Sequence, residues 1–304
     1  MKQKNHNLIT NMNSVAHENL SQFLSKPYQI NKDGEGFVIE ANRKLPESYF
    51  EHLLFPISNF WRSYFLEKLD LIEPIEKNLC IDVCCGTGTL CLNVIPQLGF
   101  KKCIAIDNSQ VAIDILRGRI KTDEPIEAIK ADITKTHFEN ASVDAVYGNS
   151  FLHHLPDNYA FLHEAYRTLK PGGILVFTGE PSIGAELLET AIPKSVGALL
   201  RFFRLRKINQ TDRNAVLTDI WLYEEQSLNT MLSEVGFTEI KIQGFGILVP
   251  LFNVITAVVL GKLTGKSMQP DVYWKWMGWL DKKMFSWVPA NKCAHFTVAA
   301  RKPL

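Results

Sequence analysis

The chain has 304 residues, of which 46% are hydrophobic, so it can bury a sizeable core in one elaborated domain or two small ones. This composition excludes a disordered or fibrous chain. Its 33 basic residues are balanced by 32 acidic ones, and a formal net charge of +1 provides no global field to attract nucleic acid.

Residues 1–45 are expected to form a leader that contains a small hairpin. Their opening stretch is polar and lacks the apolar run of a secretory signal, which favours a cytoplasmic protein. Tyr28–Asn31 and Phe37–Glu40 flank a Gly-rich turn around Gly34, the pattern of two short paired strands. Residues 46–304 are expected to form the main domain, which begins with one or two helices within Tyr49–Leu69.

From residue 78 onward, short apolar segments alternate with helical patterns, which predicts a parallel sheet covered by helices on both faces. Two of the helices have recognisable starts, one at Asp107-Asn108-Ser109 and one at Asp157 or Asn158. Another helix is expected near Glu224–Val235. The expected strands are Leu79–Val83, Cys103–Ile106, Ile126–Ala131, Ala145–Tyr147, Ile174–Phe177, Thr238–Ile242 and His295–Arg301.

The first of these strands runs into a Gly-rich turn that contains Gly86 and Gly88. Glycine allows a sharp change from strand to helix and lets a ligand approach the backbone, because it has no Cβ. Roughly 20 residues further on, the second strand ends at Asp107, and an acid in this position can accept hydrogen bonds from both ribose hydroxyls. The turn alone is equally compatible with a connection that binds nothing. Together, the two features indicate an adenosine ligand.

Residues 79–89, 105–109, 131–133, 143–155 and 169–173 together resemble the class I S-adenosylmethionine-dependent methyltransferases. The resemblance implies an α/β, Rossmann-like, doubly wound fold of seven strands, mostly parallel with an antiparallel last strand. It also implies S-adenosylmethionine as cofactor, with Asp107 on the ribose, Asp132 on the adenine amino group and Ile133 on the adenine face. The cofactor-binding set that it implies is Asp82, Cys84, Gly86, Thr87, Gly88, Asp107, Asn108, Asp132, Ile133 and Asn149.

One departure qualifies this resemblance. Cys84 stands where the family often has a glycine, a mild change because small residues recur there. Leu169–Gly173 looks like the family's turn into the fifth strand, and we interpret it as a loop made by Pro171 and the following glycines. The six cysteines lack the paired spacing of a zinc site and are interpreted as reduced thiols.

Two other enzyme classes fit less well. A nicotinamide-dependent dehydrogenase needs a third small residue for close helix packing after its glycine turn, whereas this turn continues through Leu90 to Cys91. The Asn-Pro-Pro-Tyr signature of amino-group DNA methyltransferases is absent, and so is a Pro-Cys nucleophile for a cytosine carbon. Nucleic-acid bases are therefore not the expected substrates.

Methyl transfer from a sulfonium requires an aligned acceptor and the exclusion of water, with no need for a metal. A hydroxyl or protonated amine acceptor also needs a base. His153 and His154, after the fourth strand, are the candidate bases, with His153 on the acceptor side and His154 in support; packed core histidines are the alternative. Asn149 could orient an acceptor or cap a turn. Ser150 and Glu180 are candidate substrate contacts, with an exposed loop carboxylate as the alternative for Glu180.

Two helical insertions are expected, at about 182–221 and 246–293. The first holds the basic, aromatic run Leu199–Lys207, which we interpret as a lid, with a membrane-surface helix as the alternative. The second includes the apolar run Ile247–Leu260, which is shorter than the ~20 residues that a membrane span needs. The tryptophans and lysines that follow suit an acceptor pocket, a dimer contact or a membrane surface.

The sequence therefore predicts a methyltransferase that modifies an O, N or C atom of a small apolar or aromatic metabolite. Its expected partner is this small-molecule acceptor and not nucleic acid, with peripheral membrane contact and a homodimer as open alternatives. The rival function is a non-catalytic protein that binds the cofactor or uses the fold as a scaffold for its apolar insertions.

Overall fold

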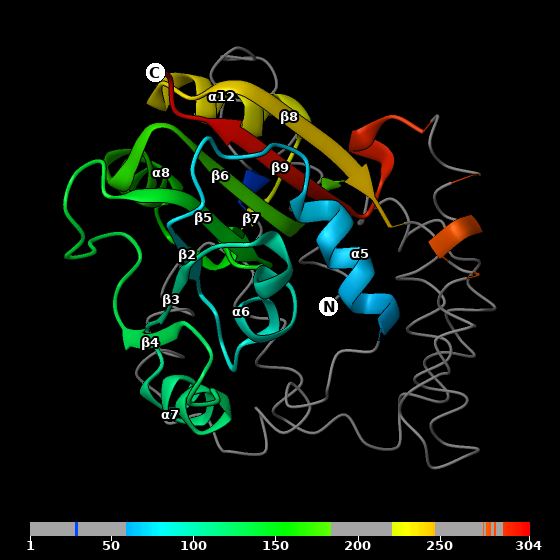
Figure 1. Ribbon diagram of the computed structural model, residues 1–304. Helices are drawn as coiled ribbons and strands as arrows, with labels where there is room; N and C mark the ends of the chain where they lie inside the picture. Colours follow the sequence, from blue (N-terminus) through cyan, green and yellow to red (C-terminus); the bar gives the residue numbers. More distant parts are fainter. Residues whose placement is uncertain are drawn as a thin grey trace, which may run out of the picture.

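The computed structural model describes residues 28–29, 59–183, 221–246, 276, 278–280, 283 and 288–304. Most of these residues form a twisted sheet with helices on both of its faces (Figure 1). The strands of this sheet lie side by side in the order β4-β3-β2-β5-β6-β9-β8. Their bounds are Leu79–Val83 (β2), Lys102–Asp107 (β3), Ile126–Lys130 (β4), Val143–Asn149 (β5), Leu169–Pro181 (β6), Thr238–Phe245 (β8) and His295–Arg301 (β9).

Strands β4, β3, β2, β5 and β6 pair in parallel, and β9 is antiparallel to both of its neighbours, β6 and β8. The prediction of a seven-stranded, mostly parallel sheet with an antiparallel last strand is therefore confirmed. Each segment that the sequence predicted as a strand of this sheet also forms one. Strands β3, β5, β6 and β8 extend beyond their predicted bounds, whereas β4 ends one residue earlier than predicted.

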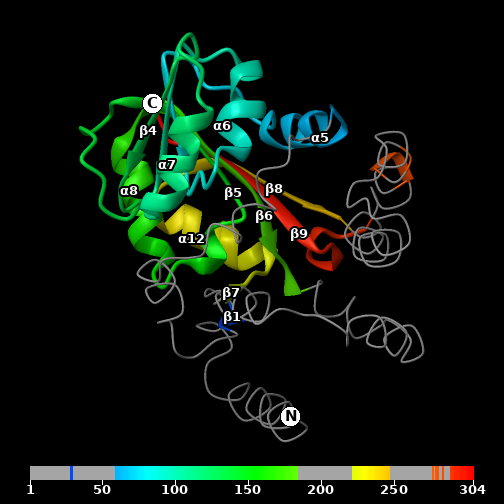
Figure 2. The ribbon, with the colours of Figure 1, turned by 90° about the horizontal axis from the view of Figure 1, so that it is seen from below.

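Two layers of helices cover the sheet (Figure 2). The helices α5 (Asn59–Leu69), α6 (Thr89–Asn93) and α7 (Gln110–Arg119) pack on one face, where Leu69, Leu90 and Leu116 share a core cluster with Cys80 of β2. On the other face, α8 (Asn158–Thr168) and α12 (Glu225–Val235) pack in a second cluster that contains Ile81. Successive residues of β2 thus point into opposite cores, which explains its nearly continuous apolar sequence.

The two predicted helix starts are confirmed. Ser109 caps α7, because its side chain accepts a hydrogen bond from the Ala112 backbone N–H at 3.3 Å. Asp157 caps α8 in the same way, with the Ala160 N–H as donor at 3.0 Å. These caps satisfy backbone donors that the first turn of a helix leaves without a partner.

The expected loop at Leu169–Gly173 is wrong, because β6 already begins at Leu169. Leu169 pairs with Val143 of β5, and the ladder then shifts register before Ile174. The Gly172 N–H donates to the Lys302 carbonyl at 2.9 Å, and the Lys302 N–H donates to the Gly173 carbonyl at 2.9 Å. Pro171 and the glycines therefore produce an irregularity within the strand, and the segment after β9 supplies hydrogen bonds that local sequence signals do not reveal.

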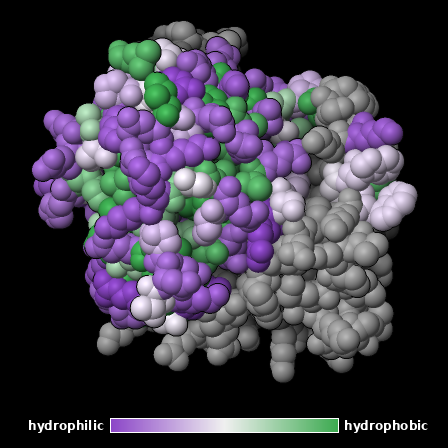
Figure 3. Space-filling model, viewed as in Figure 1, coloured by the Kyte–Doolittle hydropathy of each residue, from purple (hydrophilic) through white to green (hydrophobic). Residues whose placement is uncertain are grey.

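Tyr28 and Gln29 form β1, which pairs in antiparallel fashion with β7 (Trp221–Leu222). The second arm of the expected hairpin, Phe37–Glu40, lies outside the described residues, and so do Leu199–Lys207 and Ile247–Leu260. None of the described helices is long and apolar enough to cross a membrane. Hydrophilic side chains cover much of the described surface seen in Figure 3, with apolar ones interspersed among them.

Candidate functional site

The carboxyl ends of β2, β3, β4, β5 and β6 meet at one edge of the sheet. β3 and β5 lie on opposite sides of β2, so the chain connections diverge at this point. Open α/β sheets bind ligands beyond such a switch point. The Gly-rich turn follows β2, Asp107 ends β3, residues 131–133 follow β4, and Asn149 ends β5. The sequence-predicted site residues are therefore brought to one edge.

The Gly-rich turn has a left-handed backbone at three positions, with φ of +49° at Cys84, +53° at Gly86 and +99° at Gly88. A Cβ added at Gly86 would meet nothing within 4 Å, so its backbone faces open space. At Gly88, by contrast, a Cβ would lie 2.6 Å from Leu116 Cδ1 and 2.7 Å from Leu92 Cδ1. Gly86 is thus accessible to a ligand, whereas Gly88 allows α6 and α7 to pack closely. Cys84 thus has a backbone conformation that glycine adopts more readily, and it stands where the methyltransferase family often has a glycine.

Alanine substitution at the two glycines is expected to separate these roles. Gly86→Ala introduces left-handed strain of roughly 1–2 kcal/mol. Gly88→Ala adds overpacking of about 1–3 kcal/mol to the same strain, so it should lower the free energy of unfolding considerably more. Urea denaturation of both variants measures this difference. Equal destabilisation would show that Leu92 and Leu116 move aside without cost.

Asp107 links β3 to the Gly-rich turn. Its Oδ2 accepts a hydrogen bond from the Gly86 N–H at 2.9 Å, and its Oδ1 accepts one from the Ser109 N–H at 2.8 Å. Burial raises the pKa of Asp107, and the backbone donors of Ser109 and Gly86 offset only part of this rise. Because a carboxylate can accept about four hydrogen bonds, it retains capacity for further donors such as a pair of hydroxyls.

Asp82 and Thr87 are placed differently from the expectation of direct ligand contact, because both side chains are buried. Asp82 Oδ2 accepts a hydrogen bond from the Cys91 N–H at 3.0 Å and so supports α6 from inside the protein. Burial raises the pKa of Asp82 to about 7, and Asp107 adds to this rise. Asp82 thus shapes the turn from within, whereas Gly86 and Asp107 present groups at its outer side.

Asp132 is exposed after β4, and its Oδ1 accepts hydrogen bonds from the Thr134 N–H at 2.8 Å and the Thr134 hydroxyl at 2.7 Å. Ile133 is buried and belongs to the core cluster beneath α8, so little of its side chain is available to an adenine face. Asn108 is half-buried after Asp107. This side of the edge therefore offers Asp132 as its accessible polar group.

Asn149 ends β5, and Ser150 follows it beside the end of β6. Ser150 is exposed and has a φ of +56°. Its N–H donates to the Thr178 carbonyl at 2.7 Å and its hydroxyl donates to the Gly179 carbonyl at 3.2 Å. A Cβ added at Gly179 would lie 3.1 Å from Asn149 Oδ1, which shows how closely the two strand ends approach. Asn149 is half-buried and remains a candidate ligand contact.

Glu180 is not an exposed loop carboxylate, because it has no accessible surface. Its Oε1 accepts hydrogen bonds from the Phe151 and Leu152 N–H groups, and its Oε2 accepts one from the His153 N–H, each at 3.0 Å. His153 Nδ1 lies 2.8 Å from the same Oε2. Although burial alone would raise the pKa of Glu180, His153 and these backbone donors hold it below its usual value. Glu180 therefore organises the turn after β5 from inside, and a direct substrate contact is not supported.

The two histidines have different surroundings. His153 is buried against Glu180, whereas His154 is half-buried, and their ring centroids lie 3.9 Å apart. This order is the reverse of the expectation that His153 lies on the acceptor side and His154 supports it. His295 of β9 lies nearby, and burial together with the charge of His153 lowers its pKa to about 4.

Sequence reasoning missed three residues that hold the edge in place. Arg119 of α7 donates to the Thr87 carbonyl at 2.5 Å and so anchors the Gly-rich turn. Glu164 and Arg167 of α8 bind the loop between β4 and β5. The opposite charges of Glu164 and Arg167, three positions apart in a predicted helix, were the available signal for this contact, but such pairs are common on solvated helix faces.

Comparison with known proteins identifies a methyltransferase domain in this chain. Residues 81–177, from β2 through most of β6, match the family model of a methyltransferase domain. A demethylmenaquinone methyltransferase of Lactococcus lactis is 27% identical over 130 residues, which cover 41% of this chain and 50% of that protein. One from Staphylococcus saprophyticus is 23% identical over 195 residues, which cover 61% and 79%.

A solved structure of Haemonchus contortus phosphoethanolamine N-methyltransferase 2 in complex with S-adenosyl-L-methionine has a TM-score of 0.55 at 16% identity. The alignment covers 88% of this chain and 57% of that one. The chain thus spans about half the length of the Lactococcus and Haemonchus proteins. At this level of identity the structural likeness shows a shared fold.

Proposed function

We propose that this chain, whose residues 81–177 belong to the class I family of S-adenosylmethionine-dependent methyltransferases, transfers a methyl group from S-adenosylmethionine to a small-molecule acceptor. The observation that carries the proposal is the pairing of Gly86 with Asp107 at the switch point. An open backbone lies there beside a carboxylate that has more acceptor capacity than its backbone donors use.

The residues at this edge fit the cofactor. Asp107 would accept the ribose hydroxyls, and the open space at Gly86 would admit the chain of atoms that leads to the sulfur. Asp132, exposed at the end of β4, would accept a hydrogen bond from the adenine amino group. Asn108 and Asn149 would line the two sides of the bound molecule. In this arrangement Asp82, Thr87 and Ile133 support the site from the core, because all three are buried.

The acceptor is proposed to be an aromatic, quinol-like molecule. Both relatives described above are demethylmenaquinone methyltransferases, which supports an aromatic ring bearing a reactive carbon or hydroxyl. The apolar and aromatic residues of the 246–293 stretch are consistent with such an acceptor. Ser150, exposed beside the end of β6, would lie on the acceptor side of the site.

When bound, S-adenosylmethionine supplies a methyl group attached to a positively charged sulfur; a nucleophile attacks this methyl group in line, and the sulfur is the leaving group. The protein residues have to orient the acceptor and remove its proton. His154 is the proposed base, because its imidazole is more accessible than that of His153. Glu180 and His153 would hold the turn that presents His154, through the hydrogen bonds to residues 151–153.

His154→Ala is expected to lower kcat by about 100-fold or more, since a positioned base contributes roughly 10²–10⁴ in rate. The affinity for the cofactor should change little, because Asp107 and Gly86 are untouched. His163→Ala is the matched control, since His163 is exposed on α8 away from this turn. Steady-state kinetics with a lipophilic quinol acceptor provide the measurement. Unchanged turnover in His154→Ala would mean that the site acts by alignment alone.

Calorimetric titration with S-adenosylmethionine and S-adenosylhomocysteine tests the proposal directly, followed by assays of methyl transfer to reduced quinones. Micromolar binding together with turnover is the expected result. Folded protein that binds neither compound would refute the function. Binding without transfer to any aromatic or lipophilic acceptor would favour the non-catalytic alternative.

A further inference from the structure

The loop that joins β4 to β5, residues 131–142, starts at the proposed adenine side of the site. Asp132 begins it in a tight turn, closed by the Thr134 donors and by a hydrogen bond from the Lys135 N–H to the Asp132 carbonyl at 3.2 Å. The turn continues directly into Thr136. The position of the Asp132 carboxylate therefore depends on where the chain at Thr136 is held.

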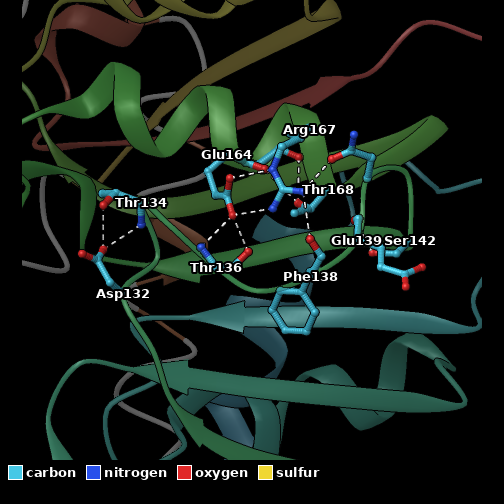
Figure 4. Close-up of polar contacts among 11 residues, drawn as sticks. Asp132, Thr134, Thr136, Phe138, Glu139, Ser142, Glu164, Arg167 and Thr168 are labelled. Carbon is cyan, nitrogen blue, oxygen red and sulfur yellow. Dashed lines mark hydrogen bonds and ion pairs between the residues drawn. The ribbon is translucent and has the colours of Figure 1, made fainter.

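Glu164 of α8 holds Thr136 (Figure 4). Its Oε1 accepts a hydrogen bond from the Thr136 N–H at 2.7 Å and also contacts the Thr136 hydroxyl. The Glu164 side chain is 11% exposed, so water competes little for these contacts. Burial alone would raise the pKa of Glu164, but Arg167 and the two Thr136 donors keep it below its usual value.

Arg167 completes the clamp on the loop. Its Nε and Nη2 donate to the two oxygens of Glu164 at 2.8 and 2.7 Å, and its Nη1 donates to the Phe138 carbonyl at 2.8 Å and to Asn140 Oδ1 at 2.6 Å. One bidentate pair thus binds the middle of the loop at several points. An isolated ion pair on a helix surface would contribute little to stability, but this pair also forms hydrogen bonds to the backbone of the loop between β4 and β5.

The helix that carries the clamp is well anchored. Phe161, Leu162 and Ala165 of α8 are buried in the core cluster between the sheet and α12. The end of the loop is also bound to α8, because the Ala141 N–H donates to the Arg167 carbonyl at 3.0 Å and the Ser142 N–H donates to the Thr168 carbonyl at 2.8 Å. The loop between β4 and β5 therefore takes its position from α8.

We propose that Glu164 is a positioning residue for the adenine side of the cofactor site: through Thr136 it sets the place of the Asp132 carboxylate, and so the protein's preference for an amino-bearing purine. This inference rests on the proposed function. Glu164 touches no reacting atom, and its effect passes through the loop. A clamp that served stability alone would leave the preference between purines unchanged.

The test compares two ligands that differ at one position of the purine. S-adenosylhomocysteine carries an amino group there, and S-inosylhomocysteine carries an oxygen. Affinities are measured by calorimetry for the wild-type protein and for Glu164→Gln, Asp132→Ala and the double variant. Glu127→Gln is the matched control, because Glu127 lies in β4 just before the same loop but forms an exposed pair with Lys102.

Glu164→Gln should weaken binding of S-adenosylhomocysteine about tenfold, the loss expected for one displaced hydrogen bond to a charged group, and S-inosylhomocysteine less than about threefold. The double variant should bind S-adenosylhomocysteine no more weakly than Asp132→Ala, because both changes remove the same interaction, the one between Asp132 and the purine amino group. Glu127→Gln should leave both affinities unchanged. Thr136→Val, which removes only the hydroxyl donor, should reproduce the selective loss and replaces Glu164→Gln if that variant fails to fold.

Equal weakening of both ligands by Glu164→Gln, or no change at all, would overturn the inference. So would a wild-type protein that binds the two ligands with equal affinity. A wild-type protein that binds neither ligand would refute the proposed function instead.

Discussion

Replacing Asp107 with alanine is expected to weaken binding of S-adenosylmethionine by about 100-fold or more. Two hydroxyls that donate to one carboxylate contribute roughly 1.5–3 kcal/mol each, and the substitution removes both acceptors. Calorimetric titration measures the loss. Asp107→Asn should bind with intermediate affinity, because the amide keeps one acceptor oxygen but has no charge.

The control for Asp107 is Ser109→Ala. This variant removes the cap of α7, at a cost of about 1 kcal/mol in stability, and leaves the carboxylate in place. It should bind the cofactor nearly as well as the wild-type protein. If it lost as much affinity as Asp107→Ala, the effect would come from a disturbed start of α7 and not from contacts to the ribose.

The affinity should also depend on pH in a defined direction. Burial raises the pKa of Asp107 above 3.8 in the free protein, and hydroxyl donors favour its charged form. Binding should therefore release a proton when the pH is near that raised pKa, and the affinity should fall as the pH is lowered through it. Asp107→Asn should lack this component of the dependence.

Glu180→Gln is expected to lower the free energy of unfolding by about 3–5 kcal/mol, the loss typical when one partner of a buried ion pair is removed. Glu180 is fully buried, and the change leaves His153 without its carboxylate and gives the N–H groups of residues 151–153 a weaker acceptor. Urea denaturation at neutral pH is the measurement. Methyl transfer should fall as well, because the turn before His154 loses its anchor.

Glu239→Gln is the matched control, since Glu239 pairs with Arg301 at 3.0 Å but is 57% exposed. Its expected loss is below about 1 kcal/mol. The sign of the pH dependence follows from the lowered pKa of Glu180. Its contribution to stability is present above the unfolded pKa of about 4.5 and is lost as the pH falls through the folded value, so the wild-type protein and Glu180→Gln should converge in acid. A constant difference at all pH values would assign the effect to packing.

The strand segments and the Gly-rich turn could be predicted because their signals are local. Leu79–Val83 and His295–Arg301 form strands with the predicted bounds, since both faces of the sheet are buried and the strands are almost continuously apolar. The prediction for Leu169–Gly173 was wrong for the opposite reason. Its Pro and Gly residues signal a loop, but pairing with Val143 and hydrogen bonds to Lys302 keep it in the sheet.

At the site, the sequence identified residue types but not the directions of their side chains. Asp82 lies next to the end of β2, Asp107 ends β3, and both carry the same group, yet one is turned toward Cys91 in the core and the other toward Gly86. The burial of Glu180 follows from the position of β6 beside β5, which brings Glu180 to a turn 27 to 29 residues earlier in the chain. No local pattern encodes such a contact.

The place of β9 between β6 and β8 has a consequence for biosynthesis. Residues 295–301 leave the ribosome after both of their neighbours, so the edges of β6 and β8 that face β9 stay unpaired until β9 has been made. That strand must then insert between segments made earlier, with Arg301 pairing to Ile174 on one side and Thr238 on the other. Closure over such long separations is slow, and the unfinished chain is the form most in need of chaperone protection from aggregation.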